Sequence, residues 1–259
     1  MRKIKAGRIL ILIAIPICIV MGLFFYFSRN DEKTIDTSYY DLDQFVYKNG
    51  LMSYLDSSYK TMTGIDVSSF NKEIDWNSVK NDGINFAMIR CGFRGGEDGI
   101  LYDDPRYEEY MEAAKKAGLS VGVYFYSSAI TTSELDEEVE YVLNRVKRYS
   151  LDFPIAYDME YYNDAGRIVG LSKKEKTKMA LRFCEKIEAA GYVPMVYGNM
   201  SWLYNDVQFG RVSKYLIWLA SYSQTCTMED EFKMWQYSSQ ASVQGIDGVV
   251  DIDLWIEKK

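Results

Sequence analysis

Two acidic residues, Asp158 and Glu160, stand two positions apart at the end of a short apolar run, Ile-Ala-Tyr-Asp-Met-Glu. On an extended segment, side chains two residues apart point to the same face, so we expect the two carboxyl groups to be neighbours. Because like charges at short range disfavour double ionisation, at least one of the two pKa values should rise. A protonated acid then stands beside an ionised one, which suits cleavage of a glycosidic bond.

Two further acids occupy comparable positions. Asp66 ends an earlier apolar run, Gly-Ile-Asp-Val-Ser-Ser, and Asp251 lies in the last one, Val-Val-Asp-Ile-Asp. In folds of parallel strands and helices, the carboxyl ends of the strands meet at one mouth, so we expect all four acids to face a common site. A strand-end Asp can instead cap the next helix, and a D-x-E pair alone also arises by chance. The recurrence of acids at several strand ends favours the catalytic interpretation.

The composition narrows the chemistry further. The 259 residues include no histidine, which removes His-dependent triads, His-containing zinc sites and imidazole as a general base. We therefore expect neither a metal nor another cofactor. The cysteines are widely spaced without a C-x-x-C pair, so we expect no disulfide framework and read them as small apolar residues: Cys18, Cys91, Cys184 and Cys226.

An uncharged apolar segment runs from Ile9 to Phe27, behind a short stretch that carries four basic residues. This length can cross a bilayer as a helix, and the basic flank places the N-terminal end in the cytoplasm. We predict a cytoplasmic tail at 1–8, a transmembrane signal anchor at 9–27 and a cell-membrane protein whose remaining chain lies outside, on the cell-wall side. A cleaved signal peptide is the alternative, but no small-x-small site ends the apolar run.

The exported part of the chain is acidic. Beyond Arg29 it carries 25 basic and 37 acidic residues, a net charge of −12. This charge argues against nucleic acid as a partner. Ligand capture would depend on a groove and on aromatic side chains.

Short apolar runs alternate with amphipathic segments after Met62, as expected of an α/β fold. The expected strands are 64–67, 86–91, 120–125, 155–158, 193–197, 216–220, 234–237 and 249–252. The expected helices are 107–117, 133–149, 173–190 and 201–209, with Gly118 and Gly191 as helix stops. We predict a β/α barrel with a simplified C-terminal half. A doubly wound open sheet is the alternative, although no glycine-rich phosphate loop follows the first strand.

Two regions follow from this pattern. Residues 62–259 are the predicted catalytic domain, and 28–61 an extracytoplasmic stalk or lead-in. Within the lead-in, some apolar residues could form a short element docked on the domain: Leu42, Phe45, Val46, Leu51 and Leu55.

The order of the motifs resembles a known family. They are Gly64-Ile65-Asp66-Val67-Ser68, Asp158-x-Glu160, Trp218-Leu219-Ala220 with Tyr222, Trp235-Gln236-Tyr237, and Gly245 to Asp251. Between Met62 and Trp255 the chain resembles glycoside hydrolase family 25, the Chalaropsis-type lysozymes. The resemblance implies an irregular, flattened barrel of eight strands with about five helices. It also implies an N-acetylmuramidase that cleaves the β-1,4 bond between N-acetylmuramic acid and N-acetylglucosamine in peptidoglycan.

The resemblance also implies roles for the acids. Glu160 would be the general acid and then activate water, while Asp158 would stabilise the substrate's own 2-acetamido group as it attacks the anomeric carbon. Asp66 and Asp251 would hold the sugar and tune the pair. Inversion through an activated water remains the alternative.

Aromatic side chains near strand ends are candidates for sugar contact, because their faces stack on pyranose rings. Together with Gln236, the candidates are Tyr124, Tyr126, Tyr197, Trp218, Tyr222 and Trp235. Plain barrel packing is the alternative for each. Two departures from the family are Phe125, where His is frequent, and Tyr157, where Leu is more usual; we expect Phe125 to point away from the site.

Three other functions compete with the muramidase interpretation. A non-catalytic glycan-binding protein could keep the barrel, but it would be expected to lose one of the four acids, and none is missing. A hydrolase of another N-acetylated glycan would need the same acetamido chemistry. A metal-dependent deacetylase is disfavoured by the absence of histidine.

Overall fold

The computed structural model describes residues 38–161 and 165–259. The predicted cytoplasmic tail, the predicted anchor at 9–27 and the start of the predicted stalk lie outside the described residues. Among the residues described, no helix has the length and apolar character needed to cross a membrane.

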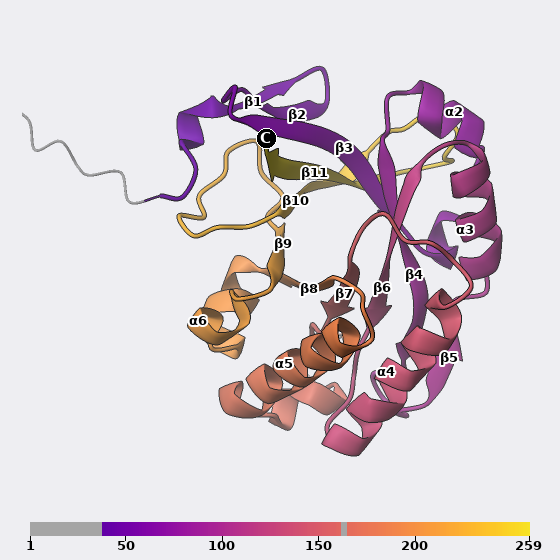
Figure 1. Cartoon of the computed structure of the whole chain (residues 1–259), viewed down its shortest axis with the longest axis vertical. Coiled ribbons are helices and arrows are strands. Elements are labelled where there is room, and N and C mark those ends of the chain that lie inside the picture. Colours follow the sequence, from indigo (N-terminus) through magenta and orange to yellow (C-terminus); the bar gives the residue numbers. More distant parts are fainter. Residues whose placement is uncertain (1–37, 162–164) are drawn as a thin grey trace, which may run out of the picture. The chain divides into compact units, whose positions relative to one another are not determined.

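Eight strands form a closed barrel (Figure 1). They are β3 (Tyr59–Val67), β4 (Phe86–Arg94), β6 (Ser120–Tyr126), β7 (Ile155–Asp158), β8 (Pro194–Asn199), β9 (Leu216–Ala220), β10 (Met234–Ala241) and β11 (Val250–Lys258). The ring closes because β3 pairs with both β4 and β11. From β3 to β10 the neighbours are parallel, and β11 is antiparallel to both β10 and β3. The predicted barrel is confirmed, and the doubly wound alternative is wrong.

The helices connect the parallel strands on the outside of the barrel. In the described part they are α2 (Trp76–Asn81), α3 (Tyr107–Lys116), α4 (Thr132–Val146), α5 (Lys173–Ala189) and α6 (Phe209–Val212). Gly118 and Gly191 follow α3 and α5 with φ of 81° and 87°, the left-handed conformation expected of helix stops. The helix expected at 201–209 is instead a π-helical turn, Trp202–Asp206, followed by α6. The short helix α2 was not predicted.

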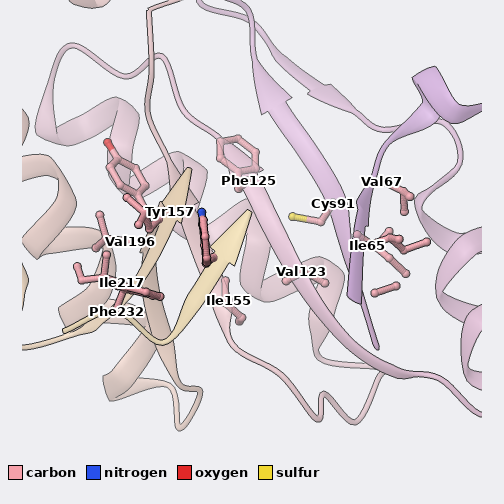
Figure 2. Close-up of a cluster of buried hydrophobic side chains, with 14 of the residues drawn as sticks. Ile65, Val67, Cys91, Val123, Phe125, Ile155, Tyr157, Val196, Ile217 and Phe232 are labelled. Carbon is pink, nitrogen blue, oxygen red and sulfur yellow. The ribbon is translucent and has the colours of Figure 1, made fainter. Parts of the chain in front are cut away.

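Side chains alternate between the two faces of each strand, so the barrel has one core on its outside, under the helices, and another in its interior. Figure 2 shows part of the outer one, where Val123, Phe125, Ile155 and Tyr157 belong to a buried cluster. A second cluster comes from the opposite strand faces and fills the barrel interior: Phe86, Met88, Phe153, Ala156, Met195, Tyr197, Trp218, Ala220, Met234 and Trp255. Because side chains fill the interior, the barrel is a packed support whose open space lies at one end.

The start of the family-like motif depends on this inner packing. A Cβ on Gly64 would come within 2.2 Å of the Phe86 ring. Only glycine lets the first strand approach that ring, and this close approach sets the position of Asp66 two residues later.

A hairpin precedes the barrel and packs on it. Strands β1 (Phe45–Lys48) and β2 (Leu51–Tyr54) pair with each other in a separate two-stranded sheet. The short strand β5 (Leu101–Asp103) pairs with β4 at the edge of the barrel sheet. Tyr40 is buried and donates its hydroxyl to the carbonyl of Phe232, while the Phe45 ring meets Trp235 edge-on at 5.3 Å. The compact unit therefore begins at Ser38, before the expected boundary at Met62. Residues 38–58 pack on the barrel, and Tyr59 already begins β3.

Candidate active site

A cavity of about 720 Å³ opens at the carboxyl ends of the parallel strands. All four predicted acids line it: Asp66, Asp158, Glu160 and Asp251. They come from strands far apart in the sequence, which the closed barrel brings to one mouth.

Strand register sets the heights of these side chains. Asp158, the last residue of β7, is the Cα partner of Tyr126 on β6 and of Tyr197 on β8. Glu160 lies beyond the strand end, where its carbonyl accepts a hydrogen bond from the Tyr126 hydroxyl at 3.3 Å. Tyr126 thus contacts the backbone that carries the predicted general acid.

Burial dominates the electrostatics of the Asp158–Glu160 pair. Asp158 is 6% exposed, and burial raises its pKa well above the usual range, reinforced by the charge of Glu160 and opposed by Arg90. Burial also raises the pKa of Glu160, and the charge of Asp251 adds to this. The sequence predicted a raised pKa for at least one of the two acids, and both pKa values are raised. The first proton lost leaves a charge that holds the remaining proton in place.

Asp66 is held by a short hydrogen-bond chain. The Gln236 amide donates to Asp66 Oδ2 at 2.7 Å, and the Tyr197 hydroxyl donates to Gln236 Oε1 at 2.9 Å. Burial raises the pKa of Asp66 well above its usual range, as do the charges of Asp253 and Asp251, whereas the Gln236 bond lowers it. These two hydrogen bonds fix the carboxyl group of Asp66, while burial and the neighbouring charges favour its protonated form.

A fifth acid, Asp253, lies behind this group and was not singled out in the sequence. Its Oδ1 accepts the Trp218 indole N–H at 2.8 Å, and its carboxyl group hydrogen-bonds the carboxyl group of Asp66, which requires a proton on one of the two acids. Burial raises the pKa of Asp253 to about 8 and that of Asp251 to about 6. The two-residue spacing from Asp251 on a strand was a signal that could have identified it.

Most of the predicted sugar-binding residues do line the cavity. These are Tyr124, Tyr126, Tyr197, Trp218, Tyr222 and Gln236. The rings of Tyr197 and Trp218 meet edge-on at 4.9 Å, which fixes part of the wall. Tyr222 is 61% exposed and remains open to a ligand.

Trp235 corrects one expectation. It is fully buried outside the cavity, where its indole N–H donates to the Ser221 carbonyl at 2.9 Å. Adjacent residues on a strand face opposite sides, so the inward position of Gln236 turns Trp235 outward. The same rule accounts for Phe125, which packs against Tyr141 away from the site, as expected.

Other lining residues were missed because they come from loops or lack an acidic signal. They include Ser68, Phe70, Arg90, Phe93, Gly95, Gly96, Glu97, Asp98, Tyr102 and Tyr161. Within the described lining, Arg90 is the sole cation, and its Nε donates to Asp104 Oδ2 at 2.9 Å. The cavity is therefore acidic and aromatic. Across residues 38–161 and 165–259, no group of three or more Cys, Asp or Glu side chains is arranged to hold a metal ion.

Comparison with known proteins gives one matching family. The family model described as Glycosyl hydrolases family 25 matches residues 65–246. The chain is 28% identical over 197 residues to an autolytic lysozyme of Clostridium acetobutylicum, with 76% of this chain and 56% of that protein covered. It is 27% identical over 198 residues to Lysozyme M1 of Streptomyces globisporus, with 73% of this chain and 65% of that protein covered. The chain thus spans less than two thirds of either relative.

Solved structures share the fold. A bacterial lysozyme from Streptomyces coelicolor superposes with a TM-score of 0.63 at 25% identity, covering 74% of this chain and 90% of that one. The modular autolysin LytC from Streptococcus pneumoniae, solved in complex with a synthetic peptidoglycan ligand, superposes with a TM-score of 0.69 at 23% identity. That match covers 82% of this chain and 52% of the autolysin chain.

Proposed function

The chain belongs to glycosyl hydrolase family 25, and on that premise we propose that it is a lysozyme-type muramidase. It hydrolyses the β-1,4 bond between N-acetylmuramic acid and N-acetylglucosamine in peptidoglycan. The observation that carries the proposal is the meeting of Asp158 and Glu160 with Asp66 and Asp251 in one cavity lined by tyrosine and tryptophan. The relatives named as lysozymes support the same substrate.

Glu160 acts as the general acid. Burial and the charge of Asp251 raise its pKa, so the carboxyl group keeps a proton at a higher pH than an exposed Glu would. It donates that proton to the leaving glycosidic oxygen, and as a carboxylate it then accepts a proton from the water that completes hydrolysis.

Asp158 acts on the acetamido group of the substrate. Its Oδ1 is buried and has no hydrogen-bond partner among the described residues, so it can accept the acetamido N–H. This orients the acetamido carbonyl oxygen, which attacks the anomeric carbon as the glycosidic bond breaks. With the proton of the pair on Glu160, Asp158 is the ionised partner and stabilises the cationic ring that forms. The product then retains the β configuration, whereas direct attack by water would invert it; NMR of the first-formed anomer distinguishes the routes.

The remaining cavity residues hold the sugar. Asp66, fixed by Gln236, and Asp251 accept hydroxyl hydrogen bonds, and the charge of Asp251 also supports the raised pKa of Glu160. Tyr222 offers an exposed ring face for pyranose contact, and the buried Trp218 ring supports the cavity wall from behind.

The segment at 9–27 anchors this catalytic domain in the cytoplasmic membrane, with the domain on the wall side. The support is the apolar run with its basic N-terminal flank. Such an anchor would restrict cutting to the wall close to the membrane.

Zymography on purified peptidoglycan tests the catalytic proposal. We expect the wild type to clear the gel and Glu160→Gln, which keeps the size of the side chain but cannot donate an acidic proton, to lose roughly 10²–10⁴-fold of the rate. Equal clearing by both proteins would contradict the role of Glu160. Binding without clearing by the wild type would favour a non-catalytic glycan-binding protein.

A further inference from the structure

A stack of four side chains forms one wall of the cavity, and we call it the Phe70 platform: Phe70, Arg90, Phe93 and Tyr102. The guanidinium carbon of Arg90 lies 5.1 Å from the ring centroids of both Phe70 and Phe93. Phe93 stacks in turn on Tyr102, with centroids 5.1 Å apart and planes at 21°. The result is a continuous surface of ring faces and one planar cation beside the acids.

The turn that carries Phe70 is held in a single conformation. It is the 3-10 turn Ser69–Asn71, closed by a capping box between Ser68 and Asn71. Asp104 Oδ2 accepts the first backbone N–H of the turn at 3.0 Å and also binds Arg90 Nε at 2.9 Å. One buried carboxylate therefore ties the turn to the platform cation, so that a ligand would not have to order either of them.

The exposure of Phe70 is unexplained by folding. At 82% it is the most exposed large hydrophobic side chain in the described part of the chain. An apolar ring gains free energy when it leaves water, and Phe70 obtains almost none of this from the fold. A ligand that covers the ring would supply it.

The platform lies across the barrel from the other aromatic wall. In the closed ring of eight strands, β3 and β4 stand opposite β8 and β9. In the platform, Phe70 follows β3, Arg90 and Phe93 lie on β4, and Tyr102 lies on β5, which pairs with β4. Tyr197 and Trp218 lie on β8 and β9. The acids at the end of β7 and on β11 lie between these two positions, so a glycan strand that runs from the acids towards β3 and β4 reaches the platform.

We propose that the Phe70 platform is a binding subsite for a further pyranose unit of the glycan strand, beyond the sugars at the cleaved bond. This inference rests on the proposed function. The apolar face of the sugar covers Phe70, and the neighbouring carboxylates of Glu97 and Asp98, which also line the cavity, accept hydroxyl hydrogen bonds at its edge. Asp98 already accepts the Tyr102 hydroxyl at 2.7 Å, which fixes it beside the platform.

Substrate length is the variable that tests this subsite. Peptide-free glycan oligomers of four and eight sugars would be compared by kcat/KM for the wild type, Phe70→Ala and Phe70→Tyr. We expect Phe70→Ala to lose about tenfold on the octasaccharide, mostly in KM, and less on the tetrasaccharide, because ring stacking contributes up to about a factor of ten. Phe70→Tyr keeps the ring and should restore the dependence on length.

Matched controls separate the subsite from other effects. Tyr47→Ala removes a partly exposed ring on β1, outside the cavity, and should behave as the wild type on both oligomers. No loss in Phe70→Ala, or an equal loss at both lengths, would overturn the inference. A loss seen only on peptide-bearing strands would overturn it too, and would point to the stem peptide as the occupant.

Binding measurements keep the inference separate from the proposed function. Titration of the octasaccharide into Glu160→Gln, with and without Phe70→Ala, needs no turnover. If the wild type fails to cleave but Phe70→Ala weakens binding about tenfold, the muramidase proposal fails and the subsite stands. Equal binding with and without the ring overturns the subsite, whatever the catalytic result.

Discussion

Asp66 on β3 and Asp251 on β11 are Cα partners at the seam where the barrel closes. The first and last strands of the barrel thus each supply one acid to the same cavity. These two acids meet only when β11 pairs with β3, so the complete set of four depends on closure of the ring. Asp158 at the end of β7, with Glu160 just beyond it, lies across the barrel from this seam.

Asp158→Asn should lower kcat sharply with little change in KM, because an amide cannot supply the negative charge that stabilises the cationic intermediate. We expect a loss of roughly 10²–10³-fold, as for other preorganised electrostatic contacts. The measurement is steady-state release of reducing ends from soluble glycan strands. The wild type should cleave de-N-acetylated strands about as slowly as Asp158→Asn cleaves the acetylated ones. Rapid cleavage of de-N-acetylated strands by the wild type would contradict the role of the acetamido group.

Asp251→Asn should move the alkaline limb of the pH–rate profile to lower pH. The charge of Asp251 raises the pKa of Glu160, so its removal lets Glu160 lose the catalytic proton earlier. The kcat profile would be recorded between about pH 4 and pH 9, a range that brackets carboxyl groups with raised pKa values. An unchanged limb, whatever the absolute rate, would show that Asp251 does not act on Glu160.

Asp253→Asn should stabilise the fold at neutral and alkaline pH. The folded pKa of Asp253 is raised to about 8, above its unfolded value, so the wild type loses stability as pH rises from the unfolded pKa towards the folded one. Asparagine stays neutral and can still accept the Trp218 N–H. Denaturant unfolding at about pH 3.5 and about pH 8 should show a gain on the order of 1–3 kcal/mol at the higher pH and little at the lower one, which lies below the unfolded pKa of about 3.9. A gain of the same size at both values would remove the link to ionisation.

Trp235→Phe and Trp218→Phe form a matched pair. Trp235 is buried outside the cavity, so its change should lower Tm while kcat/KM stays close to the wild type. Trp218 lines the cavity and donates to Asp253, so its change should lower kcat/KM as well. If Trp235→Phe impaired kcat/KM as much as Trp218→Phe did, the placement of Trp235 away from the sugar would be wrong.

The barrel could be predicted because its signals are local and repeated. Each strand is a short apolar run, and residues such as Gly118 and Gly191 mark where helices stop and strands begin. The acids stood out for the same reason, since Asp66 and Asp158 sit at the ends of such runs. Helix 201–209 was misjudged because its apolar spacing does not distinguish an α-helix from the π-helical turn at Trp202–Asp206.

Other features depend on the third dimension. Phe70 and Tyr161 come from connections without periodicity, so nothing in the sequence places them at the cavity. The orientation of Trp235 is different, because strand alternation with Gln236 already decided that only one of the two could face inward. Asp253 could also have been found from its spacing to Asp251.

In the proposed reaction, the four acids cut peptidoglycan on the muramic acid side of the linkage. Mass spectrometry of the reducing ends released from purified wall by the wild type tests it most directly, with Glu160→Gln as the blank. We predict N-acetylmuramic acid at the new reducing ends. N-acetylglucosamine at those ends would mean that the enzyme cuts the other linkage and is not a muramidase.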